Sequence, residues 1–183
     1  MRTVCCFLYD FFSVFLILKR NRNLLLYMKH ITITTDITVA NIRELSASDC
    51  ILVQKAKEAA LRAYAPYSNF NVGAAIMLSN GEIVTGANQE NAAFPSGTCA
   101  ERSAIFYAHA QYPDAKVEAI AVTAYQNGEY EEKPCAPCGA CRQSILEYET
   151  LAGKPIRVIL AGREEVYIIN GIAALLPLCF DKF

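Results

Sequence analysis

The chain contains no tryptophan, few histidines and no surplus of charge of either sign. Its 183 residues include two His, 17 Lys and Arg together, and 18 Asp and Glu, for a formal net charge of −1. Proteins that bind nucleic acid usually need a positive stripe or patch, and the sequence has no basic cluster of that kind. The composition therefore argues against a nucleic-acid partner. There are also no repeats and no low-complexity tracts, which argues for one domain.

Cysteine, in contrast, is abundant, with eight residues in the chain. An even number of cysteines can indicate a disulfide framework, but such frameworks belong to small secreted domains. A chain of 183 residues is long enough to bury an ample core without them. We therefore interpret the cysteines as free thiols in a reducing, cytoplasmic setting.

Two short motifs predict that three thiols and one carboxylate come together. The first is C-A-E at residues 99–101, and the second is P-C-G-A-C at residues 137–141. Cys138 and Cys141 lie on one face of a helical turn, so both sulfurs can reach one ion. With Cys99 they make three protein ligands, which leaves a fourth position open on a tetrahedral zinc, as in catalytic sites. Zinc deaminases carry this layout, including a Glu that is not a ligand.

Glu101 and two arginines complete the predicted site. Glu101, two residues after Cys99, cannot point the same way on a helix, so it can reach a water at the open position without being a ligand. Zinc lowers the pKa of such a water to about 7, and a carboxylate beside it can act as base and then as acid. Arg102 and Arg142 follow motif residues and could hydrogen-bond the sulfurs, which would offset their charge. They could also be surface arginines of amphipathic helices.

Two other interpretations of the cysteine motifs stay open. A structural zinc site would need a fourth ligand, and Cys135 is the nearby candidate. A redox C-x-x-C pair would leave Cys99 and Glu101 without a role. A site with a histidine ligand has no candidate, because neither histidine stands in an H-x-E pattern. We favour the catalytic zinc site and place Cys135 outside it.

Apolar periodicity and turn residues predict an α/β fold. Asp49 is expected to cap the first helix, and the expected helices lie at residues 49–64, 99–110, 138–149 and 172–176. The expected strands lie at residues 72–78, 82–86, 117–125, 156–160 and 165–169. The pattern predicts a three-layer α-β-α sandwich, in which helices cover both faces of a five-stranded mixed sheet and the last two strands pair antiparallel.

Residues 1–27 differ from the rest of the chain. They contain an apolar run from Phe7 to Leu18, which Asp10 interrupts and basic residues follow. The run is too short for a membrane span of about 20 residues, and a signal peptide would have its basic residues before the apolar run. We expect residues 1–27 to be an extension outside the functional protein, Met28 to be the true start, and residues 28–183 to be a catalytic domain with no membrane role.

From about residue 56 to residue 180 the sequence resembles the homotetrameric cytidine deaminases. Five segments in order carry the resemblance: A-P-Y-S-N-F-x-V-G-A at 65–74, T-G-x-N-x-E-N-A-A at 85–93, T-C-A-E-R at 98–102, P-C-G-A-C-R-Q at 137–143 and L-L-P at 175–177. Leu178 departs from the pattern, because a glycine commonly follows Leu-Leu-Pro in the family. The resemblance implies a cytidine deaminase-like fold, one zinc ion per chain and a homotetramer.

The resemblance also implies contacts to a small nucleoside substrate. Asn88 and Glu90 match positions that hydrogen-bond the ribose hydroxyls, although alone they would indicate turn chemistry and a solvated carboxylate. Phe70 matches an aromatic residue that packs on the nucleoside, and the backbone of Ala100 matches a contact to the pyrimidine. Phe180 matches an aromatic residue that reaches the active site of a neighbouring subunit. Phe180 could instead be an aromatic residue of a frayed C-terminus, with no role in the site.

The implied activity is hydrolytic deamination of cytidine and 2′-deoxycytidine to uridine and 2′-deoxyuridine, with release of ammonia, in pyrimidine salvage. Glu101 would protonate N3 of the base as water attacks C4, and would then pass a proton to the departing amine. A blasticidin-S-type deaminase is an alternative, against which the sugar-binding segment at 88–93 argues. A nucleic-acid editing protein would need a basic groove, and a purely structural zinc domain would show no turnover.

Overall fold

The computed structural model describes residues 29–181. The chain divides into two units, Met1–Ile33 and Thr34–Phe183. Of the first unit only residues 29–33 are described, and they form neither helix nor strand. The extension predicted at residues 1–27 lies outside the described residues. Among the residues that are described, no helix is long and apolar enough to cross a membrane.

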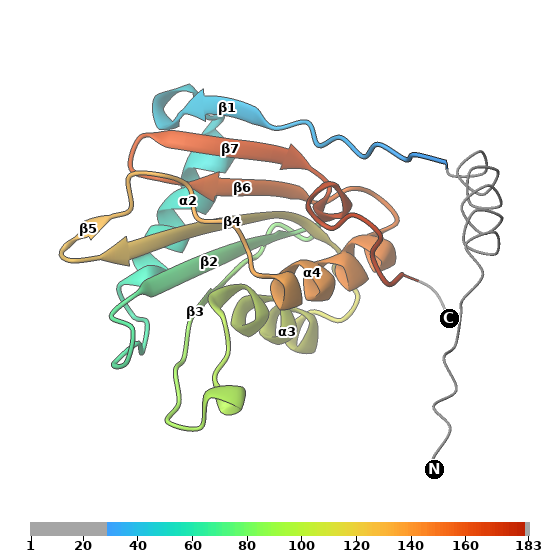
Figure 1. The fold of residues 1–183 in the computed structure, drawn as a ribbon. Coiled ribbons are helices and arrows are strands. Elements are labelled where there is room, and N and C mark those ends of the chain that lie inside the picture. The colour runs from blue at the N-terminus through green and yellow to red at the C-terminus, as the bar shows by residue number, and fades with distance from the viewer. Residues whose placement is uncertain (1–28, 182–183) are drawn as a thin grey trace, which may run out of the picture. The chain divides into compact units, whose positions relative to one another are not determined.

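The second unit is built on a seven-stranded mixed sheet (Figure 1). The strands follow the order β1-β7-β6-β4-β2-β3, and β5 pairs with β4. β4 and β6 run parallel, and the other pairs of described strands are antiparallel. The strands are β1 (Thr38–Asn41), β2 (Asn71–Leu78), β3 (Ile83–Ala87), β4 (Val117–Gln126), β5 (Glu129–Tyr130), β6 (Arg157–Ala161) and β7 (Glu165–Asn170).

Three helices cover the two faces of the sheet: α2 (Ala47–Ala60), α3 (Ala100–Gln111) and α4 (Gly139–Ala152). Successive side chains of a strand point to opposite faces, and β2 shows the division. Ala75 packs in one core cluster with Leu52 of α2, whereas Ile76 packs in the other with Ile105 of α3 and Ile145 of α4. Figure 1 shows α3 and α4 together on the face opposite α2. The predicted α-β-α sandwich is confirmed.

All five predicted strands are present, and β6 and β7 pair antiparallel as expected. The prediction of five strands in total was wrong, because β1 and the two-residue β5 bring the number to seven. Helix α2 also begins earlier than predicted. The Ser46 side chain accepts a hydrogen bond from the Asp49 amide, so Ser46 is the N-cap. The Asp49 carboxylate instead accepts a bond from Arg157 at 2.8 Å.

Two glycines allow helices to lie very close to the sheet. A Cβ atom on Gly86 of β3 would lie 2.5 Å from the amide nitrogen of Ala104 and 2.6 Å from the carbonyl oxygen of Ala100. A Cβ atom on Gly73 of β2 would lie 2.0 Å from the carbonyl oxygen of Ala56. Helix α3 is therefore seated directly on β3, and this contact sets the position of the helix end that follows Cys99.

Candidate metal centre

Three cysteine sulfurs from two helix starts form one cluster. Cys99 is the N-cap of α3, and Cys138 is the N-cap of α4. The sulfurs of Cys138 and Cys141 lie 3.5 Å apart, and that of Cys99 lies 3.9 Å from Cys138. All three sulfurs lie within 4.8 Å of one another. Three soft thiolate donors at this spacing fit a tetrahedral zinc ion with one position left for water or substrate.

The electrostatics of the cluster favour a thiolate at Cys99. A hydrogen bond from Cys141 lowers the pKa of Cys99 to about 5, and the Arg102 guanidinium contributes to the shift. The same bond with Cys99, together with burial, raises the pKa of Cys141. Helix N-termini also carry partial positive charge, which stabilises anions there. The site is therefore prepared to bind a cation through sulfur.

Glu101 lies beside the sulfurs but is not one of the cluster's ligands. Its side chain is 4% exposed. Burial raises the pKa of Glu101, and the neighbouring Cys99 adds to the shift, while a hydrogen bond with Cys141 opposes it. A carboxyl group with a raised pKa holds its proton more readily than an exposed one, and beside the sulfur cluster it can pass that proton on.

The two arginines play different parts in the structure. Arg102 donates from Nη2 to the sulfur of Cys99 at 3.9 Å. Arg142, which the sequence also suggested for the sulfurs, instead donates to two backbone carbonyls. Its Nε bonds the Pro137 oxygen at 2.8 Å, and its Nη1 bonds the Leu175 oxygen at 2.7 Å. The Pro137 carbonyl precedes a cluster cysteine and belongs to a buried residue; such a carbonyl needs a hydrogen-bond donor.

Cys135 lies outside the sulfur cluster. The group of side chains that could hold a metal, searched over the described residues, contains Cys99, Cys138 and Cys141 alone. The Cys135 thiol instead donates to the Ala136 carbonyl at 3.9 Å. Burial raises the pKa of Cys135, and the Glu101 charge raises it further. A fourth protein ligand from this residue, as a structural zinc site would require, is not in place.

A hollow of about 290 Å³ opens beside Cys99. Its walls include Asn88 and Glu90 from the loop after β3, and Arg102 from α3. Loop and helix meet here because Gln89 exchanges backbone hydrogen bonds with Thr98, the residue before Cys99. The sequence-predicted sugar-binding residues and one of the predicted metal ligands therefore line the same hollow.

The side chains of Asn88 and Glu90 also form hydrogen bonds with the backbone of the segment before β2 and at its start. The Asn88 side chain accepts from the Val72 amide at 2.7 Å and donates to the Phe70 carbonyl at 2.9 Å. Oε2 of Glu90 accepts from the amides of Tyr67 at 2.8 Å and Ser68 at 3.3 Å. A side-chain hydrogen bond from Ser68 and the backbone bonds lower the pKa of Glu90. These bonds fix both side chains in place, which pre-orders them for a ligand.

The remaining predicted contact residues, Phe70, Ala100 and Phe180, are not among the residues that line the hollow beside Cys99. Phe70 is half-buried next to β2, and Ala100 is fully buried at the start of α3. The first amides of a helix have no partner within the helix, so the Ala100 end of α3 offers N–H groups. Phe180 is 64% exposed, and its carbonyl accepts from Gln143 at 2.7 Å. Gln143 was not singled out from the sequence, although it follows Arg142 in the P-C-G-A-C-R-Q segment.

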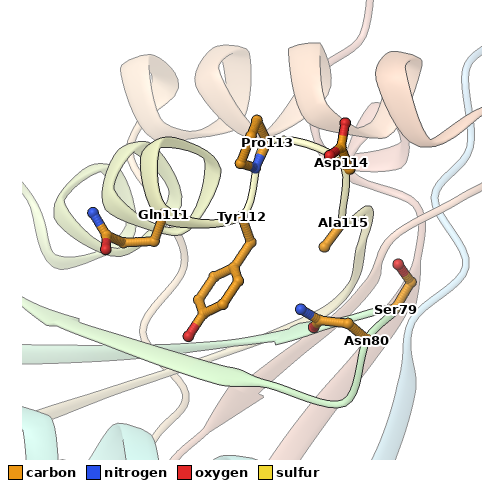
Figure 2. A pocket seen from close by; sticks show the side chains of 7 residues that line it. All are labelled: Ser79, Asn80, Gln111, Tyr112, Pro113, Asp114 and Ala115. Carbon is orange, nitrogen blue, oxygen red and sulfur yellow. The ribbon is translucent and has the colours of Figure 1, made fainter.

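A larger hollow of about 390 Å³ lies elsewhere, between the β2–β3 turn and the segment after α3. Figure 2 shows its lining, in which the Tyr112 ring and the Asn80 amide are labelled. Asp114 is the one carboxylate of that lining, and no cysteine or histidine belongs to it. This hollow offers no set of metal ligands, so the smaller one beside Cys99 is the functional candidate.

The sequence matches a known family over the region that holds this cluster. Residues 46–152 match the cytidine and deoxycytidylate deaminase zinc-binding region. This chain belongs to that family. All three cluster cysteines lie inside the matched region, and zinc is the cofactor that the family and the donor set share.

Individual cytidine deaminases are also similar to this chain in sequence and in structure. The chain is 37% identical over 139 residues to a cytidine deaminase of Sporosarcina psychrophila, covering 72% of this chain and 90% of that protein. It is 43% identical over 97 residues to one of Halalkalibacterium halodurans, covering 53% and 69%. The crystal structure of a cytidine deaminase from Burkholderia pseudomallei superimposes with a TM-score of 0.61 at 38% identity, covering 74% of this chain and all of that one.

Proposed function

We propose that this protein is a zinc-dependent cytidine deaminase that hydrolyses cytidine and 2′-deoxycytidine to the corresponding uridines and ammonia. In this proposal Cys99, Cys138 and Cys141 hold the zinc ion. The observation that carries it is the cluster of three sulfurs within 4.8 Å, with the buried carboxyl group of Glu101 beside it. A structural zinc site would need a fourth protein ligand.

In the proposed reaction Glu101 is the proton carrier. Bound zinc would supply a water molecule whose pKa is lowered to about 7. Glu101 would take a proton from the attacking water and deliver it to N3 of the base as a C–O bond forms at C4. It would then move the remaining proton, from the hydroxyl group now on C4, to the amine, so that the C4 carbonyl forms, the C–N bond breaks and ammonia leaves. The raised pKa of Glu101 supports this exchange, because the group must hold a proton between the two transfers.

The substrate is proposed to lie in the hollow beside Cys99. Asn88 and Glu90 would bond the sugar hydroxyls, since both line that hollow and are already held in place by backbone bonds. The N–H groups at the Ala100 end of α3 would donate to the pyrimidine, and Phe70 would pack on the nucleoside. The matched region is also that of deoxycytidylate deaminases, so a nucleotide is the substrate to test against the nucleoside.

We also propose a homotetramer. Several large apolar side chains are at least half exposed, including Phe94 at 76%, Tyr107 at 57% and Leu178 at 90%, and burial between subunits would remove them from water. Phe180 is proposed to act at a neighbouring subunit's site. The test mixes Phe180→Ala chains with Glu101→Gln chains. Activity must depend on which subunit carries each change; activity of Phe180→Ala equal to the parent, in an unchanged assembly, would refute the role.

Turnover and metal content of one sample test the proposed function. Protein beginning at Met28, and the full chain in parallel, would be assayed by ultraviolet absorbance on cytidine, 2′-deoxycytidine, deoxycytidylate and blasticidin S. We expect one zinc ion per chain and uridine formed in equal amount with ammonia. Bound zinc without turnover of any substrate would point to a structural site. The free thiols among the described cysteines suit a reducing cytoplasm, the proposed compartment.

A further inference from the structure

Three side chains of α4 hold the C-terminal segment, residues 172–180, beside the helix (Figure 1). Glu149 accepts from the Ile172 amide at 2.7 Å, which fixes the start of the short helix η4 (Ile172–Leu175). Arg142 donates to the carbonyl of Leu175 at the end of η4. Gln143 donates to the carbonyl of Phe180. The contacts are spread along the segment, so together they hold its whole length.

Arg142 connects the C-terminal segment to the backbone at Pro137 and Cys138, which we call the metal loop because Cys138 is one of the three clustered cysteines. One edge of its guanidinium group bonds the Leu175 carbonyl, and Nε bonds the carbonyl of Pro137, the residue before Cys138. The planar guanidinium group presents donors in fixed directions and can serve two carbonyls at once. A shift of the C-terminal segment would therefore be passed to the backbone that carries a metal ligand.

The backbone of the C-terminal segment is strained at Leu178. Leu178 has a φ angle of 54°, in the left-handed region that leucine rarely adopts, and its side chain is 90% exposed. Such strain persists only where neighbouring contacts enforce it. The bonds at Leu175 and Phe180 flank Leu178 on both sides. The next residue, Cys179, packs against the core cluster on the α3–α4 face.

We propose that Arg142 and Gln143 form a clamp that holds the C-terminal segment against the metal loop, working against the strain at Leu178. Arg142 is then a positioning residue, which keeps the Pro137–Cys138 backbone in place through its two carbonyl bonds rather than by offsetting thiolate charge. The proposal rests on the zinc site proposed above for its effect on the metal. Its effect on the segment itself can be measured without metal.

The test of Arg142 uses two variants with different charge. Arg142→Lys keeps the positive charge but loses the planar pair of donors, and Arg142→Gln loses both. Zinc release to a chromogenic chelator should be faster in both variants by about tenfold or more, as expected when a residue behind the metal ligands is lost. A parental rate in Arg142→Lys would show that only charge matters and would overturn the clamp. Unchanged release in both variants would overturn it as well.

Alkylation of Cys179, read by peptide mass spectrometry, tests the segment directly. Its rate should rise in both Arg142 variants and in Gln143→Ala, because Cys179 becomes reachable when the segment leaves the core. Cys50, which is exposed and distant in the chain, supplies the reference rate. Leu178→Gly and Leu178→Ala form a matched pair, since both remove the side chain and glycine alone relieves the strain. Alkylation should be about fivefold slower or more in the glycine variant.

Equal rates in the glycine and alanine variants, or a parental rate in Arg142→Gln, would overturn the clamp. The alkylation measurements are made on metal-free and zinc-loaded protein. A parental chain that binds no zinc would refute the proposed function, whereas the metal-free alkylation rates would still decide whether the clamp exists.

Discussion

Oε2 of Glu90 accepts the backbone amide of Tyr67 at 2.8 Å, which ties the loop after β3 to the turn before β2. The two residues are 23 positions apart in the chain. The bond aligns the carboxylate at the wall of the hollow beside Cys99. A residue proposed to recognise sugar hydroxyls therefore also has a structural task.

Glu90→Gln should change both turnover and acid stability. The folded-state pKa of Glu90 lies below its usual 4.5 because Ser68 and backbone amides bond the carboxylate. Its contribution to stability is therefore present above pH 4.5 and is lost as the pH falls through the lower folded-state value. Thermal unfolding measured from pH 6 to about pH 3 should show a smaller loss in the variant.

At neutral pH the same variant should keep its zinc and lose cytidine turnover. Glu147→Gln, at an exposed position of α4, is the matched control. If Glu90→Gln retains parental kcat/KM, the proposed sugar contact is wrong, whatever the unfolding data show.

Glu101→Gln should leave a folded protein with one zinc ion per chain and very little activity. The substitution keeps the size of the buried side chain but removes the group that carries protons, and general acid–base catalysis is worth about 100-fold to 10,000-fold. Zinc content, thermal unfolding and kcat would be measured on one preparation. Loss of the metal would show that Glu101 supports the cluster instead, and substantial activity would mean that another group moves the protons.

Cys138→Ala and Cys135→Ser should differ sharply in metal content. The first removes one of the three clustered sulfurs, so zinc should be lost and thermal stability should fall, because metal binding contributes to folding free energy. The second removes a thiol outside the cluster and should leave zinc unchanged. A fall in zinc content in Cys135→Ser would make that residue a ligand and favour a structural site.

Gly86→Ala should destabilise the fold and disturb α3. The added Cβ would lie 2.5 Å from the Ala104 amide nitrogen and 2.6 Å from the Ala100 carbonyl oxygen, so the helix must move. Overpacking of this kind costs about 1–3 kcal/mol. Gly139→Ala is the control for unfolding, because nothing lies within 4 Å of a Cβ there. Equal unfolding temperatures for the two variants would show that α3 can move away from β3 without a loss of stability.

Much of the fold follows from local sequence. The strand from 117 to 126 is a nearly continuous apolar run, and the 79–81 turn has a glycine where φ is 87°. Such signals act between near neighbours in the chain. β1 carries no such signal: it is four residues long, lies at the sheet edge, and exists because Thr38–Asn41 pairs with β7. An edge strand of this kind depends on a partner more than a hundred residues away.

The candidate site also has one part that the local sequence predicts and another that depends on distant partners. Cys99, Cys138 and Cys141 were predicted as ligands because metal chemistry dictates ligand types and spacing within each motif, and their sulfurs form one cluster. The role of Glu101 stays a prediction. The partners of Arg142 could not be identified, because a guanidinium group beside a cysteine motif can bond either sulfur or carbonyl, and Leu175 is 33 residues away. Which of the two it bonds depends on where η4 packs against α4. Sequence by itself determined the chemistry of the cluster, and only the tertiary structure decided which side chains hold its loops in place, since those bonds join distant parts of the chain.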